Sequence, residues 1–266
     1  MTPAEIVAWA LAEDVGSGDV TTELCVPAER EARGAFRVRE RVVLAGGELL
    51  SLLYDCIDFR VSDGTLLDPG QEIARVRGSA RALLTRERVA LNFLQHLSGI
   101  ATLARKYVDA VQGTGCRILD TRKTTPGLRE LEKMAARAGG VTNHRIGLFD
   151  AILIKNNHIT AAGGVRAALD AVKHAGLPVE IEVRTRAELD EALEGGATHL
   201  LLDNLTPDEA REWIRHIDGR ATVELSGGIT LETVRVYAEA GADFVSVGAI
   251  THSARAVDIH FRLELD

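Results

Sequence analysis

The sequence has few cysteines, few aromatic residues and fewer basic than acidic side chains. Its 266 residues include 3 cysteines, 4% aromatics, 31 Lys and Arg, and 39 Asp and Glu, for a formal net charge of −8. Cys25, Cys56 and Cys116 are odd in number and widely spaced, which excludes a disulfide framework and a cysteine metal site and favours a reducing compartment. An acidic chain repels nucleic acid and anionic lipid, so any anion site must be a local cluster of cations.

Long apolar segments are also missing. No apolar run approaches the roughly 20 residues of a membrane-spanning helix. Residues 1–12 contain Glu5 but no basic stretch or long apolar core, unlike a signal peptide. Hydrophobic residues at 46% and charged residues at 26% are typical of a soluble globular protein. We therefore expect a cytoplasmic protein that binds neither membrane nor nucleic acid.

The first hundred residues read as a mixed layer of helices and strands. Residues Ala35–Val43 alternate apolar and polar side chains, which predicts a strand, and Gly46–Leu53 predicts a short helix. Turn residues stand at Asp63-Gly64 and at Pro69-Gly70. This mixture of short strands, turns and a short helix ends near residue 100.

From Ile118 onward, strands alternate with helices, which predicts a parallel sheet built from βα units. The predicted strands are Arg117–Asp120, Ala151–Lys155, Val179–Val183, His199–Asp203, Thr222–Leu225 and Phe244–Val247. The predicted helices lie within 163–176, 186–196, 206–219 and 230–242, and Thr206 before Pro207 is a helix N-cap. Because only six or seven strands can be found, we predict an α/β fold with an open, incomplete (β/α) barrel.

Polar side chains follow nearly every predicted strand, where barrel active sites lie. They are Asp120, Arg122, Lys123, Lys155, Asn157, His158, Glu182, Asp203 and Asn204. At any single position such a residue is equally well explained by a polar turn. Six consecutive units with the same feature indicate an active site.

Glycines follow the last two strands. Ser226, Gly227 and Gly228 come before a predicted helix, and Gly248 and His252 follow the final strand. Glycine lets backbone N–H groups approach a phosphate, and barrels commonly place phosphate sites after their last two strands. We expect a phosphate site here.

Cations gather at other strand ends and loops. They are Arg86, Arg88, Arg122, Lys123, His144, Arg145 and Lys155. Several arginines together with lysines favour a ligand that carries carboxylates as well as phosphates.

Glu182 and Asp203 end neighbouring predicted strands, and we expect them at the same depth. Two carboxylates that face a phosphate site suit Mg²⁺ shared with substrate oxygens. Pairing with neighbouring lysines in a structural ion network is the alternative, and both arrangements can coexist.

Several motifs together resemble one known family. EDVGSGDVTT, NFLQHLSGIAT, ILDTRKTTPG, TNHRIG, AILIKNNHI, EIEV, LLLDN, ELSGGIT and VGAITHS occur in this order over nearly the whole chain. They resemble the quinolinate phosphoribosyltransferases, and DTRKT together with NHR and the Lys-x-Asn-His element is highly specific.

The resemblance implies an enzyme of NAD biosynthesis. Such a pentosyltransferase joins quinolinate to 5-phosphoribosyl 1-pyrophosphate with Mg²⁺ and releases pyrophosphate and carbon dioxide, leaving nicotinate mononucleotide. It also implies an N-terminal α/β sandwich domain over 1–98, on which the tail 253–266 packs, and a catalytic open barrel over 99–252. A homodimer is implied as well, and further assembly into a hexamer is left open.

The resemblance also assigns roles to the candidate residues. Arg88 is expected to reach the active site of the partner subunit. Contacts to quinolinate and pyrophosphate are expected from Arg122, Lys123, His144, Arg145 and Lys155. Glu182 and Asp203 are expected to contact the metal and the ribose, so the catalytic set is Lys123, Lys155, Glu182 and Asp203. The 5′-phosphate is expected at Ser226, Gly227, Gly228, Gly248 and His252.

Two positions depart from the family pattern. Asn156 and Arg184 stand where the family more often has acidic or small polar residues, and they leave the surroundings of the expected metal carboxylates more positive. Two other functions fit parts of the pattern. A Schiff-base aldolase could use Lys155 on a phosphorylated or keto-acid substrate, and a non-catalytic phosphosugar-binding protein could keep only the phosphate loops.

Overall fold

The computed structural model describes residues 1–265, which fall into two compact units. The first unit contains Met1–Arg105, Thr124–Gly140 and the chain from Ile250 onward. The second contains Lys106–Lys123 and Val141–Ala249.

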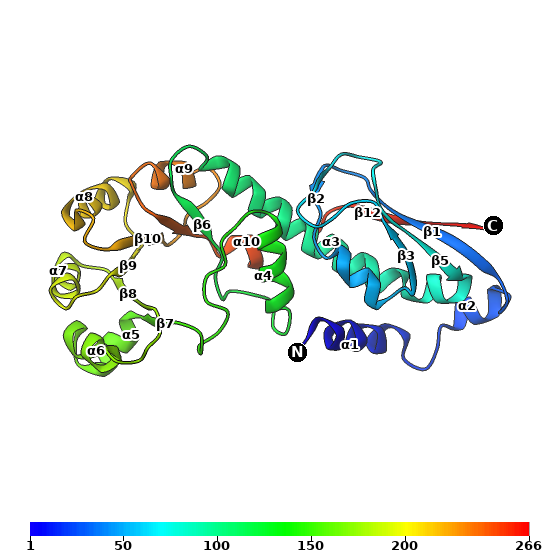
Figure 1. Ribbon diagram of the computed structural model, residues 1–266, viewed down its shortest axis with the longest axis horizontal. Coiled ribbons are helices and arrows are strands. Elements are labelled where there is room, and N and C mark those ends of the chain that lie inside the picture. Colours follow the sequence, from blue (N-terminus) through cyan, green and yellow to red (C-terminus); the bar gives the residue numbers. More distant parts are fainter. Residues whose placement is uncertain (266) are drawn as a thin grey trace. The chain divides into compact units, whose positions relative to one another are not determined.

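The first unit is built on a four-stranded antiparallel sheet in the order β12-β1-β5-β3. Its strands are β1 (Glu31–Val38), β3 (Cys56–Phe59), β5 (Glu72–Ser79) and β12 (Ile259–Leu265). In Figure 1 the red strand β12 lies beside the blue strand β1, with which it pairs from Val38↔Ile259 to Ala32↔Leu265. The C-terminal segment therefore supplies an edge strand to a sheet that begins near the N-terminus.

The single strand predicted over Ala35–Val43 is wrong. β1 ends at Val38, and β2 (Val42–Val43) pairs instead with β4 (Leu66–Leu67) in a separate two-stranded sheet. Between them, the carboxylate of Glu40 pairs with Arg255 and accepts the backbone N–H of Asp258 at 2.9 Å. Apolar residues stand on both sides of Arg39, Glu40 and Arg41, and the prediction read across these three charged residues as one strand.

Helices complete the first unit. They are α1 (Pro3–Val15), α2 (Val20–Cys25), the 3-10 helix η1 (Gly47–Leu52) at the predicted short helix, α3 (Ala80–Ala110), α4 (Arg129–Ala138) and most of α10 (Ala249–His252). Gly99 lies in the middle of α3, where a Cβ would come within 2.1 Å of the carbonyl oxygen of Arg255. The missing side chain lets the C-terminal segment cross the helix, and the N–H of Val257 then donates to the carbonyl of Gln95 at 3.1 Å.

The helix α4 belongs to the first unit, although its sequence lies among the βα repeats. The Nε of Arg105 on α3 donates to the carbonyl oxygen of Gly139 at 3.0 Å. The buried carboxylate of Glu132 lies 2.9 Å from the Nε2 of His96. The sequence assigned all of 99–252 to the barrel, and the structure differs here because α4 packs on α3.

The second unit contains a six-stranded parallel sheet in the order β6-β11-β10-β9-β8-β7. Its strands are β6 (Arg117–Leu119), β7 (Ile152–Ile154), β8 (Val179–Val183), β9 (His199–Asp203), β10 (Thr222–Ser226) and β11 (Phe244–Ser246). Within residues 1–265, β6 and β7 stand at opposite ends of this sheet and do not pair with each other. All six predicted strands are present, and the predicted α/β fold with an open barrel is confirmed.

Helices follow the strands of this sheet. They are α5 (Asn156–Ala162), α6 (Val165–Val172), α7 (Arg186–Glu194), α8 (Pro207–Ile217) and α9 (Val234–Ala238). Figure 1 shows α6, α7 and α8 in a row along the outer side of β7 to β10. The predicted N-cap is confirmed, since the hydroxyl of Thr206 accepts the backbone N–H of Glu209. The helix predicted over 230–242 is shorter than expected.

Burial along β8 explains how this sheet presents acidic residues. Ile181 and Val183 are fully buried on the face against which α7 packs. Glu180 and Glu182 alternate with them and therefore point to the opposite face.

Among the helices within residues 1–265, none is both long enough and apolar enough to cross a membrane.

Candidate active site

A cavity of about 550 Å³ lies at the carboxyl ends of the strands in the second unit. It is lined by ten of the residues that the sequence predicted for the site: Arg122, Lys123, His144, Arg145, Lys155, Glu182, Asp203, Ser226, Gly227 and Gly228. Of the thirteen residues that the family resemblance assigned to the site, the other three are not among its lining. Gly248 lies in the second unit just after β11, whereas Arg88 on α3 and His252 on α10 belong to the first unit.

Two arginines of this cavity lie close enough to repel each other. Burial, and then the positive charge of Arg122, lower the pKa of Arg145. The Nε of Arg122 is buried and has no hydrogen-bond partner in residues 1–265. A buried donor without a partner costs free energy, and two adjacent guanidinium groups favour an anion beside them. This pair therefore suits a carboxylate or a phosphate.

A buried carboxylate holds the segment that carries Arg145. Asp120, which follows β6, is fully buried. It accepts the backbone N–H of His144 at 2.8 Å and the side-chain amide of Asn143 at 2.6 Å. Residues 143–145 are thus fixed to the end of a core strand, which orients the arginine that follows.

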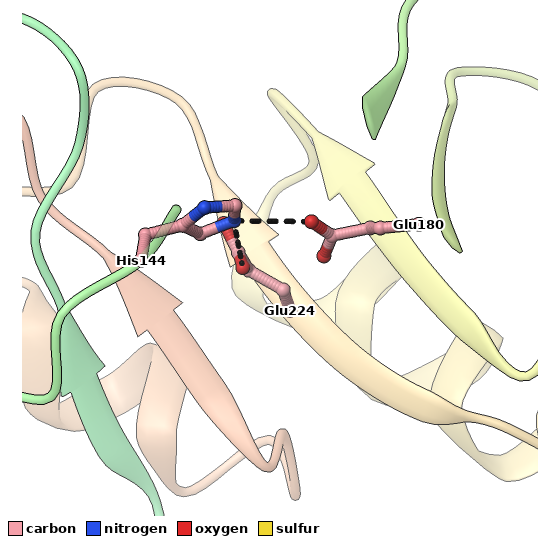
Figure 2. A group of neighbouring side chains, drawn as sticks. All are labelled: His144, Glu180 and Glu224. Carbon is pink, nitrogen blue, oxygen red and sulfur yellow. Dashed lines mark hydrogen bonds and ion pairs between the residues drawn. The ribbon is translucent and has the colours of Figure 1, made fainter. Parts of the chain in front are cut away.

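The ring of His144 is held by two glutamates from two different strands. Figure 2 shows it pointing toward Glu180 of β8 and Glu224 of β10. The Nε2 of His144 lies 3.1 Å from Glu180 and 3.3 Å from Glu224. Burial alone would lower the pKa of His144, but these two carboxylates outweigh burial and raise it. Burial, together with the charge of Glu224, raises the pKa of Glu180 although His144 opposes this.

The contact of the other ring nitrogen fixes the tautomer of His144. The Nδ1 of His144 accepts the backbone N–H of Arg145 at 2.8 Å, so the ring proton is on Nε2. From there it can donate to either carboxylate, Glu180 at 3.1 Å or Glu224 at 3.3 Å. Ligand atoms of these three residues lie within 4.8 Å of one another, but a protonated Nε2 cannot bind a metal ion. The cluster is a hydrogen-bonded anchor in this arrangement.

The sequence reasoning expected His144 to contact the substrate. Both ring nitrogens instead have protein partners, Arg145 on one side and the two glutamates on the other. His144 lines the cavity, and its Nδ1 holds the backbone of Arg145 in place.

Glu182 and Asp203 face the same cavity but not at the same depth. Glu182 is level with Leu201 in the pairing of β8 with β9, so Asp203 lies two residues farther along its strand. The predicted equal depth is therefore wrong, because the register cannot be read from strand ends. Both side chains still share one face of the sheet, since Leu201 and Asp203 are two residues apart.

Cationic side chains surround these two carboxylates. A single Nη2 atom of Arg184 lies 2.9 Å from Glu182 and 3.2 Å from Asp203, and the Nζ of Lys155 lies 3.5 Å from Glu182. Glu182 is only 4% exposed, and its Oε1 lacks a hydrogen bond of good geometry despite the nearby guanidinium. The ion network that the sequence left as an alternative is present.

This geometry fits a divalent cation. The donors are carboxylate oxygens, one of them buried without a hydrogen bond, and they converge on a point where a positive nitrogen already lies. Hard oxygen donors of this kind are the ligands that Mg²⁺ prefers.

The predicted phosphate loop follows β10 closely beside the end of β9. Gly227 has φ +103°, and a Cβ there would lie 2.7 Å from the backbone nitrogen of Asn204. Asn204 itself has φ 59°, and its N–H donates to the carbonyl of Ser226 at 2.9 Å. One part of the prediction is wrong: α9 begins only at Val234 and has five residues, so no long helix opens at the glycines.

Sequence reasoning missed Glu180 and Glu224 as parts of this site, whereas Asn204, predicted among the polar strand ends, lines the cavity. Both glutamates had a usable signal, because acidic residues inside the otherwise apolar stretches VEIEV and TVELS must find partners once the strand is buried. The left-handed backbone of Asn204 was not predicted.

Comparison with known proteins identifies the family. The sequence model of the quinolinate phosphoribosyl transferase C-terminal domain matches residues 100–262, and that of the N-terminal domain matches residues 19–98. The chain belongs to the quinolinate phosphoribosyltransferase family.

Relatives of this quinolinate phosphoribosyltransferase family match along nearly their full length. The nicotinate-nucleotide pyrophosphorylase [carboxylating] of Mycobacterium leprae is 44% identical over 94% of this chain and 93% of its own. A probable nicotinate-nucleotide pyrophosphorylase [carboxylating] of Bacillus subtilis is 38% identical over 95% and 90%. The crystal structure of NadC from Streptococcus pyogenes superposes with a TM-score of 0.92 at 39% identity, covering all of this chain and 98% of that one.

Proposed function

We propose that this protein transfers the phosphoribosyl group of 5-phosphoribosyl 1-pyrophosphate to quinolinate, with loss of carbon dioxide, in NAD biosynthesis. Family membership gives the reaction. The observation in the site that carries it is the pair Arg122 and Arg145, two adjacent cationic side chains with a buried donor that lacks a partner. Such a pair requires an anionic ligand, and quinolinate brings two carboxylates.

The substrates would divide the cavity between them. Arg122 and Arg145 bind and orient the dicarboxylate, as arginines do through paired hydrogen bonds. Lys123 and Lys155 line the same cavity and neutralise the pyrophosphate. The glycine loop at Ser226, Gly227 and Gly228 approaches the 5′-phosphate, with Gly248 and His252 as further predicted contacts.

The reaction calls for positioning and charge neutralisation more than for acid–base catalysis. The bond from ribose C1 to the pyrophosphate oxygen breaks, and the ring nitrogen of quinolinate forms the new bond to that carbon. The positively charged ring then accepts the electron pair of the bond to its 2-carboxylate, which leaves as carbon dioxide, and a proton from water replaces it. No side chain has to supply or remove a proton in the first step.

The carboxylates of Glu182 and Asp203 would hold the ribose hydroxyls and Mg²⁺. When bound, Mg²⁺ neutralises the charge of the pyrophosphate oxygens. Glu182 is the better buried of the two, and its carboxylate beside the ribose also favours the positive charge that develops at C1.

We further propose that the active protein is a homodimer in which each subunit supplies Arg88 to its partner. Leu148 and Phe149 support a protein contact on the second unit, since these large apolar side chains are 73% and 76% exposed on a loop close to Arg145. Assembly beyond the dimer and the cytoplasmic location stay predictions.

The two alternatives explain less of the site. The Nζ of Lys155 is already paired with Glu182. A Schiff-base aldolase would also leave Arg122 and Arg145 without a purpose. A protein that only bound phosphosugars would not need Glu182 and Asp203.

One assay tests the proposal. The protein is incubated with 5-phosphoribosyl 1-pyrophosphate and Mg²⁺, with either quinolinate or nicotinate. We expect nicotinate mononucleotide and carbon dioxide in equal amounts from quinolinate and no product from nicotinate. Absence of product from quinolinate would contradict the proposal.

A further inference from the structure

The guanidinium of Arg184 lies between the two carboxylates that are proposed to hold the metal and the ribose. Its Nη2 is 2.9 Å from Glu182 and 3.2 Å from Asp203, so one positively charged atom contacts both acids. The second contact has the geometry of a hydrogen bond. A divalent cation bridging these acids would need the same place.

The backbone of Arg184 is fixed while its side chain can leave. Its N–H donates to the carboxylate of Glu188 at 2.8 Å, which ties the residue to the first turn of α7. The side chain itself is 45% exposed, whereas the side chains of Glu182 and Asp203 are 4% and 14% exposed. An exposed guanidinium can swing toward solvent with little loss, but the carboxylates cannot follow it.

We infer that Arg184 is a built-in competitor for the divalent cation at Glu182 and Asp203. In the ligand-free protein the guanidinium occupies the cation position and keeps the carboxylates paired. It must withdraw before both carboxylates can bind Mg²⁺. This inference rests on the proposed function for the identity of the site, but the competition itself concerns only this protein and the metal.

Competition has a defined thermodynamic consequence. If the metal ion binds only when Arg184 has moved away, its apparent Kd equals the intrinsic Kd divided by the fraction of molecules in that state. Two partly screened ion pairs hold the arginine, so removing its charge should tighten metal binding roughly tenfold. Lys155 keeps its single contact with Glu182 in such a variant.

The test measures metal binding without turnover. Mn²⁺ serves as the probe because free Mn²⁺ gives a strong electron paramagnetic resonance signal that is lost on binding to protein. The Kd of Mn²⁺ is compared for the unaltered protein, Arg184→Ala and Arg184→Met. Arg184→Met keeps much of the aliphatic stem, so it guards against a loss of folding in the alanine variant. Arg211→Ala is the matched control, since it removes the same charge from a surface pair with Asp208 on α8.

We expect roughly tenfold tighter Mn²⁺ binding in Arg184→Ala and Arg184→Met, and an unchanged Kd in Arg211→Ala. An unchanged or weaker Kd in both Arg184 variants would overturn the inference, as would an equal gain in Arg211→Ala. The phosphoribosyl transfer assay of the unaltered protein is run in parallel. Its failure would contradict the proposed function, whereas the comparison of Mn²⁺ affinities decides the competition in either case.

Discussion

The Nε2 of His144 lies 3.3 Å from a carboxylate oxygen of Glu224, while its Nδ1 accepts the N–H of Arg145. The glutamate therefore acts on the substrate site through a histidine and an arginine backbone. We expect Glu224→Ala to lower kcat/KM for quinolinate roughly tenfold to a hundredfold, because a misplaced group next to the reaction is costly.

The conservative variant separates positioning from folding. Glu224→Gln keeps an acceptor for Nε2 and should retain activity within about threefold. The control is Glu194→Ala, which removes an exposed carboxylate at the end of α7. Steady-state kinetics and thermal unfolding are measured for all three, and normal kcat/KM in Glu224→Ala would refute the positioning role.

Arg122 is expected to be essential for binding the dicarboxylate. Loss of a buried charged hydrogen-bonding partner costs several kcal/mol, so Arg122→Ala should lower kcat/KM for quinolinate by roughly a hundredfold to a thousandfold. Arg122→Lys should not restore it, since a lysine cannot form the paired hydrogen bonds of a guanidinium. Circular dichroism checks that both variants are folded, and retention of normal activity would remove Arg122 from the site.

Lys155 is predicted to act on the pyrophosphate and not as a Schiff base. Lys155→Ala should lower kcat at least roughly tenfold while changing inorganic phosphate affinity little. Rapid-quench kinetics measure the first quantity and calorimetric titration the second. Borohydride treatment with keto acids should leave the mass of the unaltered protein unchanged, and a covalent adduct at Lys155 would favour the aldolase.

Mixed dimers test whether Arg88 works across subunits. Arg88→Ala and Lys155→Ala subunits, each expected to be strongly impaired alone, are co-expressed with different tags. Random pairing gives half mixed dimers with one intact site each, hence about a quarter of normal activity. If the mixed dimers are no more active than the parents, Arg88 does not act in the partner's site.

Acid stability should depend on Glu72 in the first unit. Hydrogen bonds from Arg75 and Arg37 lower its pKa to about 2. A carboxyl whose folded pKa lies below its unfolded value stabilises the protein above the unfolded value, near 4.5, and this contribution is lost as pH falls toward 2.

The expected size is modest because the group is near solvent. Screening reduces the contribution to about 0.5–1 kcal/mol. Glu72→Gln should thus be less stable than the unaltered protein at pH 7 and equally stable near pH 2, with exposed Glu48→Gln as control. Urea unfolding between pH 2 and pH 7 measures the free energy of unfolding of each protein. If the curves of this free energy against pH are parallel for the unaltered protein and Glu72→Gln, the assignment is contradicted.

Most of the fold could be predicted from local sequence patterns. All six parallel strands were predicted because each is a short apolar run that ends in polar residues, and β8 and β9 agree to the residue. The helix α4 was assigned to the barrel, since its packing on α3 depends on contacts distant in sequence, such as that of Glu132 with His96.

The candidate site was foreseen as a set of residues but not as an arrangement. Strand ends revealed Arg122, Lys155, Glu182 and Asp203, because side chains there meet at one edge of the sheet. Their pairing was hidden, since the register that sets Asp203 two residues nearer the carboxyl end of the sheet than Glu182 depends on neighbouring strands. For the same reason the sequence could flag Arg184 but could not place its guanidinium between two carboxylates.

The fate of each quinolinate carboxyl tests the central proposal most directly. Two substrates are prepared, one isotopically labelled in the 2-carboxyl group and one in the 3-carboxyl group, and each is incubated with the protein, 5-phosphoribosyl 1-pyrophosphate and Mg²⁺. We predict that the first label leaves entirely as carbon dioxide and that the second stays in the mononucleotide, in an amount equal to the pyrophosphate released. Pyrophosphate release without labelled carbon dioxide, or no reaction with either substrate, would contradict the account.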